Sequence, residues 1–215
     1  LSKINKTQMT RPIVLFHAAS AGEFEQIKPI LNRIDRSKYF IIQSFMSPTI
    51  YNQEKDTLLA DATCYFPFDL PWTIFLFLSK IRPKYFIITR HDIWPNMIII
   101  AKRLGINISY INANIHEKTI WLRFGFKSLG KFIFKRFDTI FTGSKRLHDN
   151  VFKIAPNKQI IISGDTRFDQ IINRSKTNKD HFKGKISDTT NIIFGSIDKE
   201  DLKVIVDCFR NQFPK

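Results

Sequence analysis

The segment His17-Ala-Ala-Ser-Ala-Gly-Glu23 joins an apolar run, 12–16, to a sequence with helical periodicity. In open α/β sheets, turns of this kind lie at the carboxyl ends of strands, where ligands bind. The free backbone N–H groups of a helix start favour an anion, and Gly22 lets a ligand approach the backbone closely. Glu23 has the chemistry of a general base that takes a proton from a hydroxyl nucleophile.

A purely structural explanation of this segment competes with the catalytic one. Ser20 and Glu23 match the S-x-x-E capping box, in which each side chain binds the other residue's backbone N–H group. A capping box needs no histidine at the strand end, and a glycine in the first helical turn costs about 1 kcal/mol relative to alanine. The segment therefore fits a helix cap, a catalytic site, or both.

A second cluster of reactive side chains, Arg90-His-Asp-Ile-Trp-Pro-Asn96, follows another apolar run. Trp94 suits stacking on a sugar ring, and Asp92 and Asn96 suit binding of hydroxyl groups. The alternative is that Trp94 is an anchor of the core. Asp69 lies in a proline-punctuated turn, where capping of the next helix is a sufficient explanation.

Two further segments carry charges of interest. Arg167, in Gly164-Asp-Thr-Arg-Phe-Asp169, suits a phosphate or carboxylate, although an aspartate at a helix start is also an ordinary cap. Residues 117–137 interleave aromatic side chains with Lys and Arg, which predicts one amphipathic helix. Such a helix can lie on an anionic bilayer, or it can pack by its Phe face and leave the basic face in solvent.

Apolar, β-rich runs alternate with helical patterns along most of the chain. Strands separated by single helices predict an α/β fold with a parallel sheet that is covered by helices on both faces. The predicted strands are 12–16, 39–45, 63–66, 84–89, 107–111, 139–142 and 159–163. The predicted helices are 22–34, 51–59, 71–78, 95–104, 117–136 and 145–152.

The sequence changes character near residue 173. Residues 173–190 are polar and lack periodicity, which indicates a linker after a first domain of residues 1–172. A single β-α unit follows in residues 191–215, with a strand at 191–194, a turn at Gly195-Ser196 and a helix at 198–209. One such unit cannot bury its own faces, so we expect it to begin a second domain that this chain does not complete.

Charge is the strongest feature of the composition, with 34 Lys and Arg against 19 Asp and Glu and a net charge of +15. This charge suits nucleic acid, a phospholipid surface or a phosphorylated substrate, although a solvated basic surface also explains it. No apolar run of the sequence is long enough to span a bilayer. Cys64 and Cys208 are far apart and indicate neither a disulfide framework nor a zinc site, which fits a reducing, cytoplasmic compartment.

Taken in order, these segments resemble the 3-deoxy-D-manno-octulosonic acid (Kdo) transferases of lipopolysaccharide synthesis. The matching pieces lie within residues 12–170 and are His17–Glu23, Tyr65–Asp69, Arg82-Pro83, Ile93–Asn96, Asn112-Ala-Asn114 and Gly164–Asp169. Each piece is short, but six of them in the same order make the resemblance specific.

The resemblance implies the N-terminal half of a GT-B glycosyltransferase with two facing Rossmann-like domains, held at the cytoplasmic face of the inner membrane. It implies transfer of Kdo from CMP-Kdo to a lipid A precursor, lipid IVA, with no metal or other cofactor, and with Glu23 as catalytic base. The expected acceptor-binding residues are His17, Ser20, Gly22, Asp69, Asp92, Trp94 and Asn96. The donor is expected at Arg167 and Ser196, and the membrane at Trp121, Phe124 and Lys131.

The chain departs from the family pattern at Arg90-His91-Asp92, where the family carries glutamates. Asp92 can replace one acid, whereas Arg90 reverses a charge. Because only one unit of the donor domain is present, we expect this polypeptide alone to transfer little or no Kdo. Two other functions stay open: a GT-B glycosyltransferase with a different donor, and a non-catalytic basic module on anionic membrane or nucleic acid, although no nucleic-acid-binding signature is present.

Overall fold

The computed structural model describes residues 11–177, 192 and 194–212 of the chain. The chain forms two compact units, Leu1–Arg174 and Ser175–Lys215, and each is described by itself. Within the described residues, no helix is both long and apolar enough to cross a membrane.

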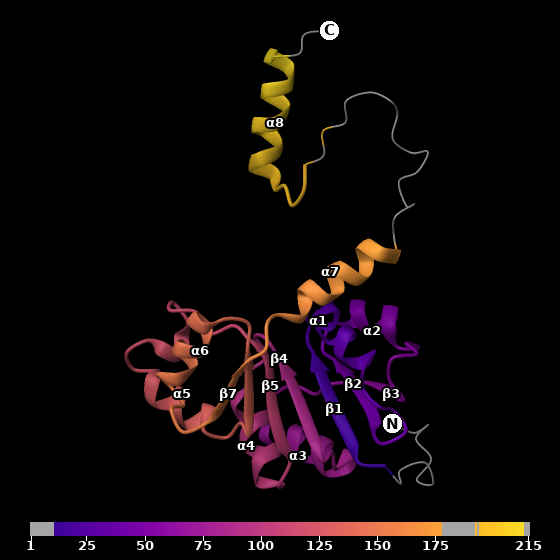
Figure 1. The fold of residues 1–215 in the computed structure, drawn as a ribbon, viewed down its shortest axis with the longest axis vertical. Coiled ribbons are helices and arrows are strands. Elements are labelled where there is room, and N and C mark those ends of the chain that lie inside the picture. The colour runs from indigo at the N-terminus through magenta and orange to yellow at the C-terminus, as the bar shows by residue number, and fades with distance from the viewer. Residues whose placement is uncertain (1–10, 178–191, 193, 213–215) are drawn as a thin grey trace. The chain divides into compact units, whose positions relative to one another are not determined.

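A seven-stranded sheet forms the centre of the first unit (Figure 1), and every strand pairs in parallel with its neighbours. The strands are β1 (Ile13–Ala18), β2 (Phe40–Phe45), β3 (Ala62–Tyr65), β4 (Tyr85–Thr89), β5 (Asn107–Ala113), β6 (Thr139–Thr142) and β7 (Gln159–Ile162). Their order in the sheet is β3-β2-β1-β4-β5-β6-β7. The predicted parallel α/β fold is confirmed, and the predicted strand ends lie within two residues of the observed ones.

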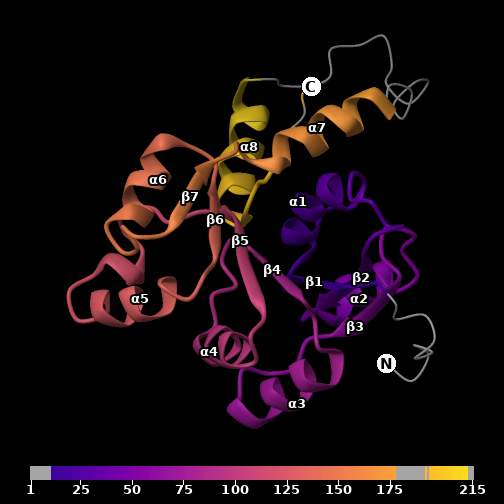
Figure 2. The same ribbon diagram turned by 60° about the horizontal axis from the view of Figure 1, so that its bottom comes forward.

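Successive side chains of a strand point to opposite faces of a sheet, so a buried parallel strand supplies two cores. Along β1, Val14 and Phe16 belong to one apolar cluster, and Ile13 and Leu15 belong to another. Helices α1 (Ala21–Leu31) and α2 (Pro48–Glu54) contribute to the first cluster. Helices α3 (Pro71–Ile81), α4 (Pro95–Arg103), α5 (Lys127–Phe134) and α6 (Lys145–Phe152) contribute to the second, on the other face of the sheet (Figure 2).

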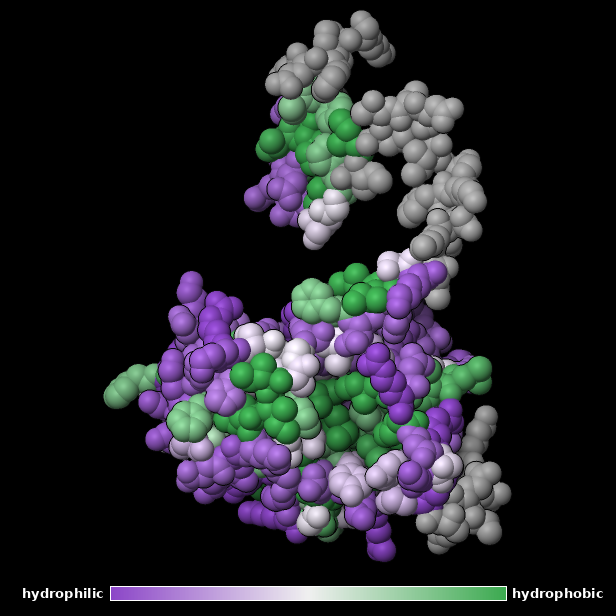
Figure 3. All heavy atoms as spheres, in the orientation of Figure 1, coloured by the Kyte–Doolittle hydropathy of each residue, from purple (hydrophilic) through white to green (hydrophobic). Residues whose placement is uncertain are grey.

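The face that carries α1 is hollowed over the middle strands. Strand residues such as Phe16, Ile87 and Phe141, together with Ile30 of α1, line an apolar groove of about 510 Å³. Hydrophobic side chains gather at this hollow near the middle of the first unit in Figure 3. The groove lies on the face of the sheet, whereas the candidate chemistry lies at its carboxyl edge.

The strand order places a topological switch point at β1. From β1 the chain proceeds through α1 to β2 on one side, and it later returns through α3 to β4 on the other side. Ligands of open α/β sheets bind at the carboxyl ends of the strands beside such a point. Glu23 lies in the first turn of α1, directly after β1, and Asp92 lies in the loop after β4, so the topology brings the two predicted clusters together.

The prediction of one helix over residues 117–136 is wrong. A 3-10 turn, η2 (Ile120–Leu122), is separated from α5 by a loop in which Gly125 has a φ of 88°. That left-handed conformation suits glycine and ends helical propagation. The loop folds the turn back onto α5, where a Cβ on Gly130 would lie 2.8 Å from the carbonyl oxygen of Trp121.

The organisation after β7 also differs from the prediction. Helix α7 (Thr166–Thr177) extends beyond residue 173, where the linker was expected to begin. In the second unit, Ile192 and Phe194 are not in a strand. Positions 191 and 193 of the predicted strand lie outside the described residues, and so do residues 178–190 of the predicted linker. The predicted final helix is present as α8 (Lys199–Gln212).

Candidate active site

Helix α1 begins with the complete capping box that the sequence predicted. Glu23 N–H donates to Ser20 Oγ at 3.4 Å, and Ser20 N–H donates back to Glu23 Oε2 at 3.1 Å. Glu23 Oε2 also accepts from Ser20 Oγ at 3.2 Å and from Ala19 N–H at 3.0 Å. Among the described residues no group donates to Oε1, so one carboxylate oxygen of Glu23 is held and the other is available.

A second carboxylate, Asp92, meets Glu23 at the backbone of Ala19. The same Ala19 N–H group that binds Glu23 lies 2.9 Å from Asp92 Oδ2. The loop after β4 reaches this position through Arg90, which has a left-handed φ of 56°. Tyr110 Oη donates to the Arg90 carbonyl oxygen, and Arg90 N–H donates to the carbonyl oxygen of Ile111 at 3.1 Å. Neighbouring strand β5 therefore fixes the turn that carries Asp92.

Two ionised carboxylates in these positions would repel each other. Glu23 is 7% exposed and Asp92 is 6% exposed, so water screens their repulsion weakly. Burial first, and then the charge of Glu23, raise the pKa of Asp92 from 3.8 to about 7, against the hydrogen bonds from Ala19 N–H and the Trp94 side chain. Asp92 therefore gains and loses its proton near neutral pH, next to the Glu23 carboxylate.

His17 lies beneath the carboxylates with no exposed surface, which corrects the expectation that it binds an acceptor directly. Its Nδ1 is 3.0 Å from Ser44 Oγ, its ring centroid is 4.3 Å from that of Phe66, and its Nε2 is 3.7 Å from Asp92 Oδ2. Burial lowers the pKa of His17 to about 3, although the hydrogen bond with Ser44 opposes the shift. The ring is therefore neutral, and it supports the loop positions without adding charge.

Asp69 and Asn96 bind each other instead of standing free. Asp69 accepts from the backbone N–H groups of Asn96 at 3.1 Å and of Met97 at 2.7 Å, and Asn96 Nδ2 donates to the Asp69 carbonyl oxygen at 2.7 Å. Asp69 thus caps α4, whereas a cap on α3 was expected, because the loop before α3 lies against the start of α4. Both side chains are committed to joining the two loops.

Trp94, at the start of α4, is 43% exposed, so the alternative of a buried core anchor does not hold. Gly22 is also exposed, and an added Cβ there would have nothing within 4 Å. Trp94 therefore presents a ring surface next to Asp92, and Gly22 leaves an open approach to the first turn of α1.

Arg90 and His91 add positive and polar character to the same edge. Arg90 Nε lies 3.2 Å from His91 Nε2. Burial, followed by the charge of Arg90, lowers the pKa of His91. The Arg90 side chain is thus the cation of this loop.

The loop after β7 joins the helix of Glu23 through α7. Thr166 Oγ1 donates to the Gln26 carbonyl oxygen at 2.6 Å, and Asn112 binds both the Oγ1 and the backbone N–H of Thr166. Further along α7, Gln170 and Arg174 contact Glu25 of α1 at 2.9 Å and 2.7 Å. Sequence reasoning assigned no role to Asn112 or Thr166, although both lie in segments that carried the resemblance.

Arg167 does not point freely into a site. Its Nη2 and Nε bind Asp165 Oδ2 at 2.6 and 2.9 Å. Asp165 in turn has a lowered pKa, because the bonds and charge of Arg167 outweigh the effect of burial. Ser196, the other expected donor contact, has a left-handed φ of 59° and belongs to the second unit.

The expected membrane contacts divide into inward and outward side chains. Trp121 packs against the core cluster of α3–α6, with its ring 6.0 Å from that of Phe134. Phe124 is fully exposed and Lys131 is exposed. Among the described residues, no group of three or more His, Cys, Asp and Glu side chains is arranged to hold a metal ion.

Comparison with known families gives a consistent result. The family model described as 3-Deoxy-D-manno-octulosonic-acid transferase (kdotransferase) matches residues 1–170. The chain is 28% identical to the 3-deoxy-D-manno-octulosonic acid transferase of Chlamydia muridarum, in an alignment that covers 91% of this chain and 47% of that protein. The enzyme of the same name from Aquifex aeolicus is 27% identical, with coverage of 90% and 49%. The chain therefore spans about half the length of these relatives.

Solved structures share the fold at low identity. The UDP-GlcNAc 2-epimerase of Neisseria meningitidis matches with a TM-score of 0.65 and 12% identity, over 94% of this chain and 63% of that one. MurG of Acinetobacter baumannii matches with a TM-score of 0.54 and 8% identity, over 95% of this chain and 58% of that one. These matches identify the sheet and its helices as a GT-B architecture.

Proposed function

The chain belongs to the 3-deoxy-D-manno-octulosonic acid transferase family, and from that premise we propose that the complete protein transfers Kdo from CMP-Kdo to the lipid A precursor lipid IVA. The observation that supports a catalytic role for this chain is the Glu23 carboxylate. One of its oxygens is fixed by three donors, and the other has no donor among the described residues. A base must be held in place and still have a free oxygen, and Glu23 meets both requirements.

The proposed reaction begins when a hydroxyl oxygen of the acceptor attacks the anomeric carbon of Kdo. The bond from that carbon to the CMP phosphate breaks, the phosphate leaves with the electron pair, and the hydroxyl proton passes to Glu23 Oε1. Deprotonation during the attack makes the oxygen a better nucleophile, and a positioned base of this kind contributes about 10²–10⁴-fold to the rate.

Asp92 lies beside the proposed base. Its pKa is raised to about 7, and its carboxyl group hydrogen-bonds to Glu23 when it carries a proton. Asp92 interacts with the side chains of both Glu23 and Trp94. We propose that Gly22 and Trp94 contact the acceptor sugar directly, while Ser20, His17, Asp69 and Asn96 hold the two loops in position.

Arg167 is proposed as a donor contact that exchanges partners. Its Nε and Nη2 both bind Asp165 Oδ2, and a phosphate offers the guanidinium several oxygens and more negative charge. Ser196, a residue of the second unit, is also proposed to contact the donor. The acceptor is a membrane lipid, so we also propose that the protein works at the cytoplasmic face of the inner membrane.

The test is an assay of Kdo transfer from CMP-Kdo to lipid IVA by the complete protein and its Glu23→Gln variant. Loss of the base predicts a fall in kcat of about 10²–10⁴-fold with little change in KM for the donor. Glu54→Gln is the matched control, because Glu54 is bound to Lys28 at 2.7 Å on the surface side of α1 and should keep normal turnover. Near-normal turnover of Glu23→Gln removes the base assignment, and a preference for another nucleotide sugar removes the donor assignment.

A further inference from the structure

Helix α1, which carries Glu23 in its first turn, contains a proline further along. Pro29 has no backbone N–H group, so the helical hydrogen bond from position 29 to the Glu25 carbonyl oxygen cannot form. The first two turns of α1 are therefore joined to the rest of the helix less firmly than a complete set of helical bonds would join them. Their position depends more on contacts with other elements.

Apolar packing holds one side of α1, and an open groove lies along the adjacent side. Phe24 and Ile27 are fully buried in the cluster on this face of the sheet. Ile30 instead lines the apolar groove of about 510 Å³ over the middle strands. Apolar contact has no preferred direction, so it presses α1 onto the sheet without fixing small shifts toward the groove. Hydrogen bonds, which are directional, fix such shifts.

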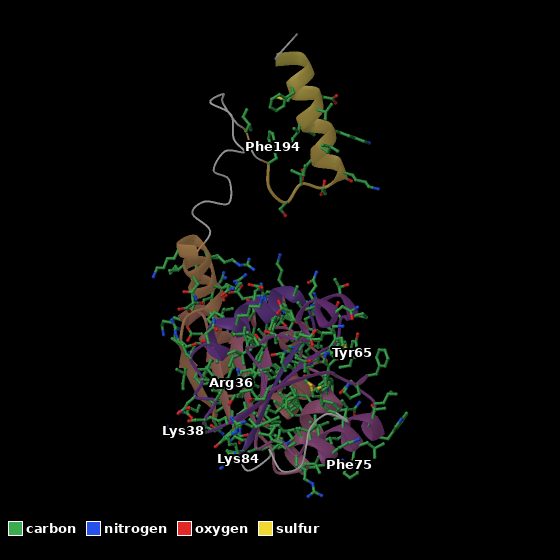
Figure 4. All side chains as sticks on the ribbon, turned by 90° about the vertical axis from the view of Figure 1, so that its right-hand side faces the viewer. Arg36, Lys38, Tyr65, Phe75, Lys84 and Phe194 are labelled. Atoms are coloured by element: carbon green, nitrogen blue, oxygen red, sulfur yellow. The ribbon has the colours of Figure 1, made fainter. Side chains whose placement is uncertain are left out.

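Helix α7 makes contacts of this directional kind with α1, in the turn before the proline. Thr166 Oγ1 donates to the Gln26 carbonyl oxygen at 2.6 Å, and Gln170 Nε2 donates to Glu25 Oε2 at 2.9 Å. Arg174 forms an ion pair with the same Glu25 oxygen at 2.7 Å. The three α7 residues are spaced four apart, so they share one side of that helix. In Figure 4, α7 (orange) lies next to α1 (indigo), as these contacts require.

Thr166 is itself bound to the sheet through Asn112 of β5. Asn112 Nδ2 donates to Thr166 Oγ1 at 2.8 Å, and Thr166 N–H donates to Asn112 Oδ1 at 3.2 Å. Asn112 is 7% exposed and has a left-handed φ of 50°. A residue other than glycine keeps such a conformation where the surrounding structure fixes it. The bonds from Asn112 through Thr166 to Gln26 therefore join α1 to a rigid point of the sheet.

We propose that Thr166 is a positioning residue for Glu23: it fixes the first turns of α1, and with them the candidate base, relative to the sheet. Gln26 is less than one helical turn from Glu23, so a shift of α1 at Gln26 moves the Glu23 carboxylate by a similar distance. The consequence for catalysis rests on the proposed function, because a reacting group misplaced by about 1 Å loses about 10²-fold in rate.

Direct binding of a substrate by Thr166 is the competing role, and its contacts argue against that role. Its hydroxyl group donates to Gln26 and accepts from Asn112, and its backbone N–H group is bound to Asn112 as well. Thr166 therefore has no unused donor to offer a substrate, and its polar groups serve to hold α1.

The first experiment measures the pKa of the Asp92 carboxyl group in the 215-residue chain by ¹³C NMR titration, so it is independent of catalysis. Burial, and then the charge of Glu23, raise this pKa to about 7, so the value reports where Glu23 lies. Thr166→Val keeps the shape of the side chain but loses the bond to Gln26. The pKa of Asp92 should fall by about 0.5–1 pH unit as Glu23 moves away. Thr166→Ser keeps the hydroxyl group and should keep the pKa of the unmodified chain.

Asn150→Ala is the matched control for lost stability. Asn150 Nδ2 donates to the Ile115 carbonyl oxygen at 3.0 Å, so this variant loses a buried hydrogen bond in α6, on the other face of the sheet. It should leave the pKa of Asp92 unchanged. Gln170→Ala is a milder second variant, which should lower that pKa in the same direction by less, and it decides the question if Thr166→Val does not fold. The proposal is overturned if both α7 variants leave the pKa of Asp92 unchanged, or if Asn150→Ala lowers it equally.

The second experiment measures Kdo transfer by the complete protein. Thr166→Val should lower kcat about 10–10²-fold with little change in KM for the donor, and Thr166→Ser should keep normal turnover. In a Glu23→Gln background Thr166→Val should cause no further loss, because no base is left to misplace. An equal loss in both backgrounds overturns the positioning role. Normal turnover of Glu23→Gln instead removes the proposed function, and the pKa of Asp92 then decides the placement of α1 alone.

Discussion

Replacing Asp92 by asparagine should stabilise the protein at and above neutral pH, although Asp92 lies in the candidate site. The asparagine amide imitates the protonated carboxyl group: it keeps an oxygen for Ala19 N–H and offers a donor to Glu23. What it removes is the second negative charge. The variant therefore measures how much free energy of folding is lost when Asp92 ionises.

The size and the pH window follow from the pKa values. In the unfolded chain Asp92 ionises near 3.8, and in the folded chain its pKa is about 7. Since the folded pKa of Asp92 is raised, the contribution of this residue to stability is most favourable below about pH 4. The contribution falls as pH rises toward 7 and levels off above pH 7. At about 1.4 kcal/mol per pH unit, the cost above pH 7 is about 4 kcal/mol as an upper bound. Asp92→Asn escapes this cost.

The assay is urea-induced unfolding of the 215-residue chain and its variant at a series of pH values from about 4 to about 8. The difference in free energy of unfolding should be small at the acid end and grow steadily in favour of the variant. Asp165→Asn is the control with the opposite sign, because the pKa of Asp165 is lowered by Arg167 and its loss should destabilise the protein at neutral pH. A constant or shrinking difference for Asp92→Asn would refute the reasoning about the carboxylate pair.

Three other substitutions test the supporting structure. Gly22→Ala should stabilise α1 by up to about 1 kcal/mol in urea unfolding. If the acceptor approaches the backbone at Gly22, the same substitution should raise KM for the acceptor in the complete enzyme. An unchanged KM would exclude that approach. Asp69→Ala should lower the free energy of unfolding by about 1–2 kcal/mol, since two N–H groups of α4 lose their acceptor, whereas an unchanged midpoint would mean that water replaces the cap. Thr166→Val should cost about 1–3 kcal/mol in the same measurement because Asn112 and Gln26 lose a polar partner, and a smaller loss would show that α7 is held by its other contacts.

The sheet could be predicted from the sequence because each strand is a short apolar run followed by an unambiguous turn or helix start. The capping box of Ser20 and Glu23 was equally visible, since its spacing is local. Both features depend on residues within one or two turns of each other. This is the range over which periodicity and turn chemistry carry information.

What could not be predicted depends on contacts between distant segments. The Ala19 N–H group binds Glu23 and also Asp92, which lies 73 positions from Ala19, and no pattern in either segment predicts that contact. The same is true of Asp69. Its place in the sequence suits a cap on α3, whereas in the fold it caps α4. The broken helix at Gly125 was missed because the apolar and basic residues of 117–136 keep a helical period through a glycine that the backbone uses as a turn.

Helix α7 is fixed to two other elements of the first unit near its start. Gly164, with a φ of 82°, supplies the turn, and the helix beyond it is tied to α1 through Thr166, Gln170 and Arg174. Asn112 of β5 also binds Thr166, so the first turn of α7 joins the sheet to α1. Since Glu23 lies in the first turn of α1, the chain that leaves β7 is fixed to the same helix that carries the candidate base.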